Sequence, residues 1–336
     1  MSIKKFWHKR RVLITGGSGF IGSWLTLALL EHGAEVVILA RENIKNPLLA
    51  SMNLPQLKVI EADITDFTSL SRMFKRCKAD TCFHLAGQPI VSIANESPFP
   101  TFESNIKGTW NVLESARQAQ VKRLIIASAD KAYGDQKILP YTEEMPLLAV
   151  HPYGASKICA ELLSRTYLNT YGLPVAIVRS SNTYGGGDLN LTRIIPDTIN
   201  AVLNNKNPVI RGNGSSLRDF VYIKDIIDAY LILAESLHKN RVKGESFNLG
   251  SGRPISILEI VKKIIEISGR KNLFPVVLGK VNPENEISRQ YLSNKKAGRI
   301  LGWHPRYDLE RGLKLTINWY KDFYGIIFKY ENKSSG

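Results

Sequence analysis

Two short segments of the chain contain residue types that commonly transfer protons. In the first, Tyr153 stands four residues before Lys157. At that spacing on a helix the two side chains share one face, one turn apart, so an ammonium group can lie near a phenol. A nearby positive charge favours phenolate and lowers the pKa of a tyrosine from about 10 toward neutrality. Tyr153 is therefore a candidate general base for an alcohol, assisted by Lys157.

The second segment joins an acid to a base directly after an apolar run. Asp130 and Lys131 follow the run RLIIA at residues 123–127. With the first segment, this pair predicts hydride chemistry coupled to a second proton transfer; the alternative is a surface ion pair, which contributes little. As a base Lys131 needs a lowered pKa, and as an acid Asp130 needs a raised one. An intimate ion pair would shift both pKa values the other way.

The elements that must hold these residues alternate between strand-like and helix-like patterns. Apolar runs predict strands at residues 11–15, 35–39, 57–61, 81–85, 124–127 and 175–178. Such alternation is typical of βαβ units, so we predict an α/β fold: a Rossmann-type, doubly wound parallel sheet with a smaller α+β substrate-binding cap. The predicted dinucleotide-binding domain spans residues 1–181, with 220–250 returning to it, and the predicted cap spans 182–219 and 251–330.

A glycine-rich turn after the first strand predicts a dinucleotide site. Gly16, Gly19 and Gly22 lie where this strand leads into an apolar helix. Glycines there let the backbone approach a pyrophosphate, and the helix N-terminus stabilises its charge. The candidate cofactor-binding residues are Gly16, Gly19, Phe20, Ile21, Gly22, Arg41, Asp63, Ile64, Leu85, Ala86, Gly87, Asn105, Tyr153 and Lys157.

The end of the second strand bears on which cofactor is bound. The acidic residue expected there to bind a ribose hydroxyl is replaced by Ala40, and Arg41 and Glu42 follow. A guanidinium at this point can bind a 2′-phosphate, which favours NADP over NAD. Glu42 could still reach a ribose, and Arg41 could be a solvated surface residue, so both cofactors stay open.

Three further polar residues have both a structural and a functional interpretation. Asp63 could bind an adenine amino group or simply cap a loop or helix. Asn105 falls inside a helix, where its role could be structural. His84 lies on an apolar strand, which favours a core residue over a ligand.

The composition is that of a globular protein with an unusually positive charge. The 336 residues are 44% hydrophobic and 22% charged, with a formal net charge of +15. Basic residues are spread along the chain and form no known nucleic-acid motif, which favours a solvated surface and a pocket for a phosphate-bearing small molecule. There is no apolar run of membrane-spanning length, no signal-peptide pattern and no metal-ligand spacing among the three cysteines. We expect a cytoplasmic protein without a metal, nucleic-acid or membrane partner.

With these residues in view, the chain resembles the extended short-chain dehydrogenase/reductases, in the NAD-dependent epimerase/dehydratase family. The resemblance covers nearly the whole chain and includes TGGSGFIG (15–22), HLAGQ (84–88), the Tyr153/Lys157 pair and RDFVY (218–222). The likeness is greatest to CDP-glucose 4,6-dehydratases, through SADKAY (128–133), GGGD (185–188) and LGWHPR (301–306). Because RDFVY is closer to the general epimerase pattern, the nucleotide base stays open.

The resemblance implies a nucleotide-sugar 4,6-dehydratase. Tyr153, helped by Lys157, would take the proton of the 4-hydroxyl while C4 gives hydride to a tightly bound NAD or NADP. Lys131 would be the base at C5 and Asp130 the acid for the departing 6-hydroxyl, before hydride returns to C6. The resemblance also implies a homodimer through a helix pair that includes the Tyr153 helix. The implied residues for the nucleotide-diphosphate sugar are Gln88, Ser128, Asn182, Arg193, Arg218 and Arg289.

One position departs from the family pattern. Ala129 stands where the family has a Ser or Thr that hydrogen-bonds the sugar's 4-oxygen. Ser128 is a poor substitute, because successive side chains of an extended segment point to opposite faces. Two alternatives stay open. One is a 4-epimerase or related dehydrogenase of the same fold, which needs no Asp130–Lys131 pair. The other is a catalytically weak dinucleotide-binding regulator, which Ala129 and the net charge of +15 favour.

Overall fold

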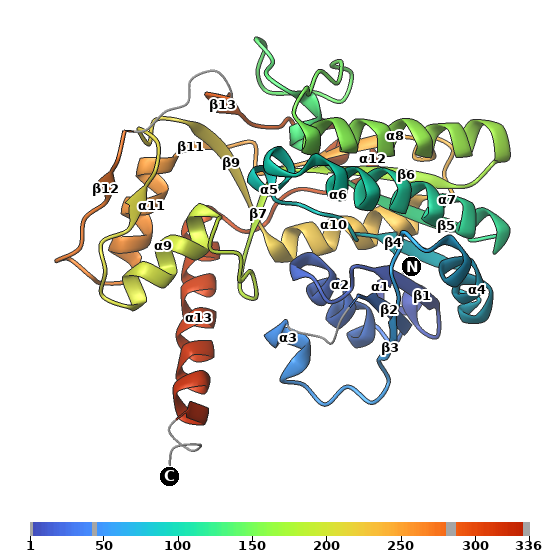
Figure 1. Cartoon of the computed structure of the whole chain (residues 1–336), viewed down its shortest axis with the longest axis horizontal. Coiled ribbons are helices and arrows are strands. Elements are labelled where there is room, and N and C mark those ends of the chain that lie inside the picture. Colours follow the sequence, from blue (N-terminus) through green and yellow to red (C-terminus); the bar gives the residue numbers. More distant parts are fainter. Residues whose placement is uncertain (1–2, 42–45, 280–286, 332–336) are drawn as a thin grey trace.

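The computed structural model describes residues 3–41, 46–279 and 287–331, and its centre is a seven-stranded parallel sheet (Figure 1). The strands lie in the order β10–β6–β5–β4–β1–β2–β3, and every neighbouring pair is parallel. This confirms the predicted Rossmann-type fold. The strands are β1 (Arg11–Thr15), β2 (Glu35–Ala40), β3 (Lys58–Glu61), β4 (Thr81–His84), β5 (Arg123–Ala129), β6 (Val175–Ser180) and β10 (Ser246–Leu249).

Helices cover both faces of this sheet. One face carries α4 (Phe67–Cys77), α7 (Gly108–Gln118) and α8 (Pro152–Tyr171), and the other carries α1 (Ile3–Trp7), α2 (Phe20–Glu31) and α10 (Ile223–Ser236) (Figure 1). The shorter helical segments are α3 (Pro47–Ala50), α5 (Val91–Glu96), α6 (Pro98–Phe102), a π-helical turn η1 (Glu103–Lys107) and a 3₁₀ turn η2 (Asp130–Tyr133). Within the described part of the chain, no helix combines the length and apolarity that crossing a membrane requires.

The remaining strands form two smaller sheets beside the main one. β9 (Leu217–Tyr222) pairs with β7 (Asn182–Tyr184), β11 (Pro254–Ser256) and β13 (Arg289–Gln290), and β8 (Val209–Ile210) pairs with β12 (Val276–Val277). The helices of this region are α9 (Ile194–Leu203), α11 (Ile257–Ile267), α12 (Lys295–Leu301) and α13 (Leu309–Glu331). On this sheet membership we propose the division into a dinucleotide-binding domain, which includes β10, and a cap.

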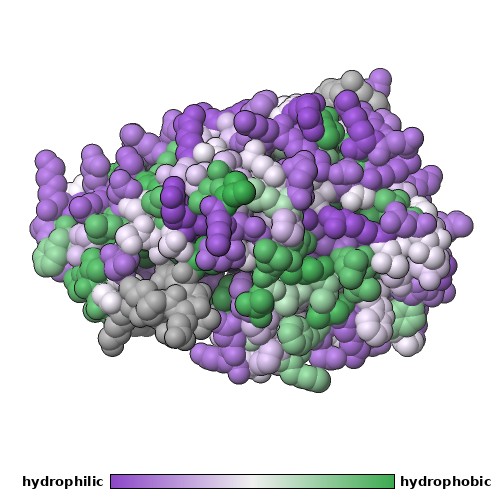
Figure 2. Space-filling model, turned by 90° about the horizontal axis from the view of Figure 1, so that it is seen from above, coloured by the Kyte–Doolittle hydropathy of each residue, from purple (hydrophilic) through white to green (hydrophobic). Residues whose placement is uncertain are grey.

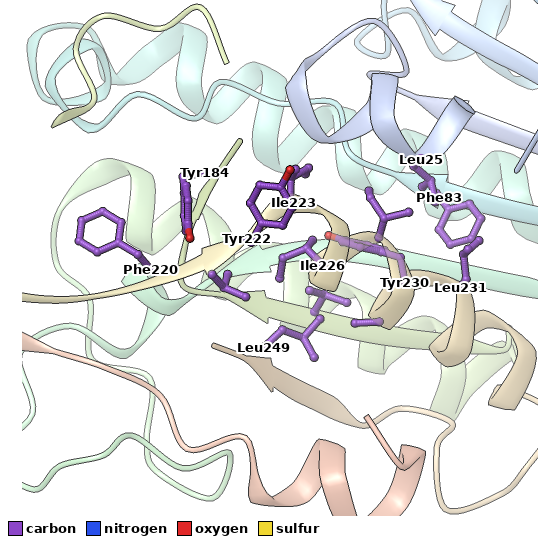
Figure 3. Packing of buried hydrophobic residues seen from close by; sticks show 14 of the residues in the cluster. Leu25, Phe83, Tyr184, Phe220, Tyr222, Ile223, Ile226, Tyr230, Leu231 and Leu249 are labelled. Atoms are coloured by element: carbon purple, nitrogen blue, oxygen red, sulfur yellow. The ribbon is translucent and has the colours of Figure 1, made fainter. Parts of the chain in front are cut away.

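A continuous apolar core joins the main sheet to the smaller one. Tyr222, at the end of β9, and Ile223, at the start of α10, are both buried, and α10 carries the core toward Phe83 on β4 and Leu25 on α2 (Figure 3). Tyr184 of β7 packs its ring 5.7 Å from that of Tyr222. This packing fixes the smaller sheet against the carboxyl ends of β5 and β6, where the predicted site residues lie.

Candidate active site

The carboxyl ends of the parallel strands open into one cavity of about 740 Å³. Ligands of open α/β sheets bind at this edge, next to the point where the strand order reverses, which here lies between β1 and β4. The cavity is lined both by the glycine turn after β1 and by residues of the smaller sheet. It therefore has room for a dinucleotide and a second polar ligand side by side.

The helix α8 places Tyr153 and Lys157 on the cavity wall. Its N-cap is His151, whose ring nitrogen Nδ1 accepts a 3.1 Å hydrogen bond from the Gly154 amide. Lys157 Nζ lies 5.8 Å from the centre of the Tyr153 ring and donates a 2.9 Å hydrogen bond to the Ala127 carbonyl. The helical spacing thus brings the pair together as predicted, and the bond to Ala127 ties α8 to the end of β5.

The expected lowering of the pKa of Tyr153 is wrong for this structure. Burial, with a further contribution from the negative charge of Asp130, raises the pKa of the Tyr153 phenol to about 12, while the positive charge of Arg193 opposes the rise. Burial also lowers the pKa of Lys157 to about 8, which the carboxylate of Glu161 partly offsets. The sequence spacing indicates neighbours, but desolvation of the buried phenol dominates the pKa of Tyr153.

The 3₁₀ turn η2 holds Asp130 and Lys131 directly after β5. Their charged atoms, Asp130 Oδ1 and Lys131 Nζ, are 3.1 Å apart, and Lys131 Nζ also donates to Oε1 of Gln290. Burial lowers the pKa of Lys131 even though Asp130 raises it. The expectation that an intimate ion pair would keep the lysine pKa high is therefore wrong, because desolvation dominates.

Asp130 itself is only 3% exposed and lines the cavity. Its second carboxylate oxygen, Oδ2, is buried without a hydrogen-bond partner among the described residues. A buried oxygen in that condition costs stability unless a ligand satisfies it. The arrangement suits a carboxyl group that meets a polar group of a bound molecule.

Ser128 lines the cavity, but its hydroxyl has an internal partner. Its hydroxyl donates a 2.7 Å hydrogen bond to Glu161 Oε1, inside a buried network that also contains Arg179. Ala129 instead faces the site, where it packs with Tyr153 and Ala94. Because β5 is extended, consecutive side chains point in opposite directions, so the Ser128 hydroxyl cannot replace the missing one at Ala129.

The glycine turn after β1 fits a dinucleotide. Gly16 has φ +70°, and a Cβ there would lie 2.6 Å from the Ala86 nitrogen; a Cβ at Gly22 would lie 2.2 Å from the Gly16 carbonyl oxygen. Gly19, the N-cap of α2, provides no side-chain cap. The α2 N-terminus therefore has no side-chain cap, which suits an anionic ligand, and this turn lines the cavity. Phe20, Ile21, Arg41, Ile64, Leu85, Ala86 and Gly87 also line it.

Two predicted cofactor-binding residues are occupied by internal contacts. Asp63 is exposed, lies outside the cavity wall, and accepts 2.8 Å hydrogen bonds from the amide and hydroxyl of Thr65, as in a simple loop turn. Asn105 is buried in η1, where its amide accepts a 2.7 Å bond from Gln88 N and donates a 3.0 Å bond to Ser156. Asn105 thus joins the loop after β4 to α8. Glu42 lies outside the described residues.

The implied substrate-binding residues are only partly brought together. Gln88, Ser128, Asn182, Arg193 and Arg218 line the cavity, whereas Arg289 is exposed on β13 and lies outside the described wall. The Gln88 side chain is already bound to Ile90 and Thr101. Arg193 pairs with Asp188 at 2.9 Å. His84 is a core residue, as expected, bonded to Thr15 and Thr109, with a pKa that burial lowers to about 3.

Sequence reasoning missed three features of the site. Gln290 contacts Lys131 from the smaller sheet, and Arg211 adds a further cation to the cavity wall. Behind η2, Arg179 and Glu161 form a buried ion pair at 2.7 Å, and Arg179 also donates a 2.7 Å bond to the Tyr133 hydroxyl. Glu161 could have been found as the residue one turn after Lys157; Gln290 and Arg211 carry no local signal.

The sheet, the glycine turn and the Tyr153/Lys157 helix define an extended short-chain dehydrogenase/reductase of the epimerase/dehydratase type. The family model described as GDP-mannose 4,6 dehydratase matches residues 13–316, and the chain belongs to that family. Relatives of similar sequence identity to this chain include both dehydratases and epimerases.

Among the relatives, CDP-glucose 4,6-dehydratase of Salmonella typhimurium is 33% identical over 95% of this chain and 92% of its own. A putative UDP-glucose 4-epimerase of Methanocaldococcus jannaschii is 34% identical over 93% and 98%. An epimerase structure from Methanothermobacter thermautotrophicus has a TM-score of 0.89 at 27% identity, covering 97% of this chain and 96% of that one. A dTDP-glucose 4,6-dehydratase from Streptomyces venezuelae, solved with NAD, has a TM-score of 0.84 at 28% identity, covering 94% and 98%.

Proposed function

We propose that the protein is a nucleotide-sugar 4,6-dehydratase, which converts an NDP-hexose to an NDP-4-keto-6-deoxyhexose, with CDP-glucose as the first substrate to test. The observation that carries this proposal is the ion pair of buried Asp130 with half-buried Lys131 on the wall of the cavity that also contains Tyr153. Epimerisation at C4 needs Tyr153 and Lys157 but no second acid–base pair. The named dehydratase relative supports the choice of substrate.

A nicotinamide dinucleotide held at the glycine turn and beside Tyr153 and Lys157 would supply the hydride acceptor for C4 of the sugar and the hydride for C6; as C6 is reduced, Lys131 would return its proton to C5. Tyr153 takes the proton of the 4-hydroxyl, and the positive charge of Lys157 stabilises the phenolate that the transfer needs. The resulting 4-ketone acidifies the C5 proton, which neutral Lys131 removes. Asp130, as the neutral acid, gives its proton to the departing 6-hydroxyl, so that water leaves across C5 and C6. The lowered pKa of Lys131 supports its part in this scheme.

The cation-rich wall of the cap supports a diphosphate-bearing substrate. Arg193, Arg211 and Arg218 come from separate elements and line the same cavity. Guanidinium groups bind phosphate oxygens in a bidentate way, and several of them at well-separated points fit a pyrophosphate. Asn182, whose amide bonds the Asp219 carbonyl at 3.1 Å, is proposed to complete this wall.

The choice between the two dinucleotides is proposed to depend on Arg41. It lines the cavity directly after β2, at the point where a ribose 2′-substituent is expected. A guanidinium there favours the 2′-phosphate of NADP over the hydroxyl of NAD. The solved dehydratase relative contains NAD, so both cofactors belong in the test.

A homodimer is proposed on the face formed by α5, α6, α7 and α8. Figure 2 looks onto this side of the molecule and shows apolar surface there. Exposed apolar residues of α6, α7 and α8 are Phe99, Trp110 and Leu162, at 73%, 49% and 65%. A large exposed apolar patch is typical of a subunit interface. Leu162→Glu, on the outer face of α8, should shift the protein toward monomer in sedimentation; an unchanged mass would refute this interface.

The test of the function is incubation with CDP-, UDP-, dTDP- and GDP-hexoses, with the products analysed by mass spectrometry and NMR. A product lighter by one water, with a 4-keto group, supports dehydration. Inversion at C4 with the 6-hydroxyl retained would refute dehydration and support a 4-epimerase. The epimerase relatives favour that alternative. An exchangeable dinucleotide and no turnover of any sugar nucleotide would leave the regulator alternative.

A further inference from the structure

Strand β13 of the smaller sheet contacts the Asp130–Lys131 pair, although it lies far from that pair in the sequence. Gln290, on β13, is fully buried, and its amide makes two contacts with η2. Its oxygen Oε1 accepts a hydrogen bond from Lys131 Nζ, and its nitrogen Nε2 donates a 3.2 Å bond to the Asp130 carbonyl. A buried side-chain amide satisfied in this way holds the turn and the lysine in one geometry.

The hydrogen-bond capacity of Lys131 determines what this contact can do. A protonated lysine carries three N–H donors, whereas the neutral amine carries two and a lone pair. The structure offers two acceptors to Nζ, Asp130 Oδ1 at 3.1 Å and Gln290 Oε1. If the two N–H groups of neutral Lys131 bind these acceptors, its lone pair occupies the remaining tetrahedral position. Because Lys131 lines the cavity, that position is available to a bound molecule.

We propose that Gln290 is a positioning residue for the C5 base: with Asp130 it binds the two N–H groups of neutral Lys131 and leaves the lone pair facing the substrate. This inference rests on the proposed dehydration. It assigns the smaller sheet a part in the elimination step, because β13, which carries Gln290, is paired with β9 of that sheet.

The amide is suited to this task because it is an acceptor without charge. The charged and titratable groups that face Lys131 are Asp130 in η2, Arg218 on β9 and His151 at the start of α8. Asp130 favours the ammonium form, while Arg218 and burial favour the neutral amine. A carboxylate at position 290 would place a negative charge beside Lys131 and favour the ammonium form, whereas an apolar residue would remove the acceptor.

Two variants separate these effects. In Gln290→Glu, which is nearly isosteric, we expect the acid limb of the kcat profile to move up by about one to three pH units, the shift that an opposite charge at contact distance produces. In Gln290→Met, we expect kcat to fall about 10- to 100-fold with KM nearly unchanged, as for a misplaced reacting group. In both, C5 deprotonation should become slower than C4 oxidation.

The readout that a merely structural role would not move is the isotope effect. Substrate deuterated at C5 should show a larger effect on kcat in both variants than in the wild type, while substrate deuterated at C4 should not. Ser288→Ala is the matched control, since Ser288 lies beside β13 and its side chain is exposed. It should retain the wild-type pH profile. Melting temperatures show which variants are folded, and Gln290→Glu keeps the test possible if Gln290→Met is not.

The outcomes distinguish this inference from the proposed function. A wild type that eliminates water, with a folded Gln290 variant whose acid limb and C5 isotope effect are unchanged, would overturn the positioning role alone. A wild type that inverts C4 without losing water would overturn the proposed function, and this inference with it. A shifted acid limb together with a raised C5 isotope effect would establish the positioning role of Gln290.

Discussion

Replacing Ala129 by threonine should accelerate the reaction, because it supplies a hydroxyl beside the general base. Ala129 ends β5, is 7% exposed, and packs against Tyr153 and Ala94. Burial and the charge of Asp130 raise the pKa of Tyr153 to about 12, so the phenolate is hard to form in the absence of a donor. A hydroxyl aimed at the 4-oxygen or the phenolate stabilises negative charge where it develops.

The proper reference for this variant is Ala129→Val, which has the shape of threonine without its hydroxyl. Both substitutions crowd a buried cluster, which costs about 1–3 kcal/mol of stability and cancels in the comparison. A hydrogen bond to a neutral or charged oxygen contributes about 1–3 kcal/mol, so kcat of the Thr variant should exceed that of the Val variant about 5- to 150-fold. Because the hydroxyl lowers the pKa of Tyr153, the acid limb of the kcat profile should also move to lower pH.

The assay is initial-rate dehydration across pH with the preferred sugar nucleotide, together with thermal unfolding of both variants. If the Thr variant is folded but no faster than the Val variant, the hydroxyl is not the missing element. The site would then function without a hydroxyl at position 129. Ser128→Ala is a further control, because that hydroxyl is bound to Glu161 and its loss should leave the pH profile unchanged.

Three further predictions concern other parts of the site. Since burial lowers the pKa of Lys157 to about 8, its ammonium is present below that pH and lost above it. The rate should therefore fall above about pH 8. Lys157→Met should abolish this alkaline limb of the pH–rate profile as well as most of kcat. Glu161→Gln leaves the guanidinium of Arg179 buried without its carboxylate and should lower the free energy of unfolding by about 3–5 kcal/mol in urea titrations, whereas a loss below 1 kcal/mol would contradict a buried ion pair. Arg41→Ala should weaken NADP binding at least about tenfold while leaving NAD binding nearly unchanged, measured by calorimetry on cofactor-free protein; equal effects on both would show that Arg41 does not contact the 2′-position.

The parts of the site that the sequence predicts correctly depend on short-range geometry. The glycine turn follows a strand and opens a helix, so its place at the sheet edge is dictated by the βαβ unit. The Tyr153/Lys157 pair is fixed by helical periodicity, and the opposite orientation of Ser128 and Ala129 by the extended strand. Such relations hold within a few residues and need no knowledge of the tertiary fold.

What the sequence could not predict depends on burial and on distant contacts. The pKa of Tyr153 is raised rather than lowered, because burial removes solvent from the phenol and the charge of Asp130 adds to the effect. Gln290 lies 159 residues after Lys131, and nothing in its local sequence distinguishes it from a surface glutamine. Asn105 and Asp63 match family positions, but their hydrogen bonds are to neighbouring segments.

The placement of the Asp130–Lys131 pair away from solvent favours a dehydratase over an epimerase. A surface ion pair contributes little and a buried one costs desolvation, so stability alone gives no reason to keep these charges inside. Here the carboxylate is 3% exposed and, among the described contacts, has one oxygen without a hydrogen-bond partner, which makes the arrangement costlier still. An epimerase would gain nothing from that cost, because its chemistry ends at C4. A dehydratase needs a neutral amine and a protonated acid within reach of C5 and C6, and burial favours the neutral form of the Lys131 amine.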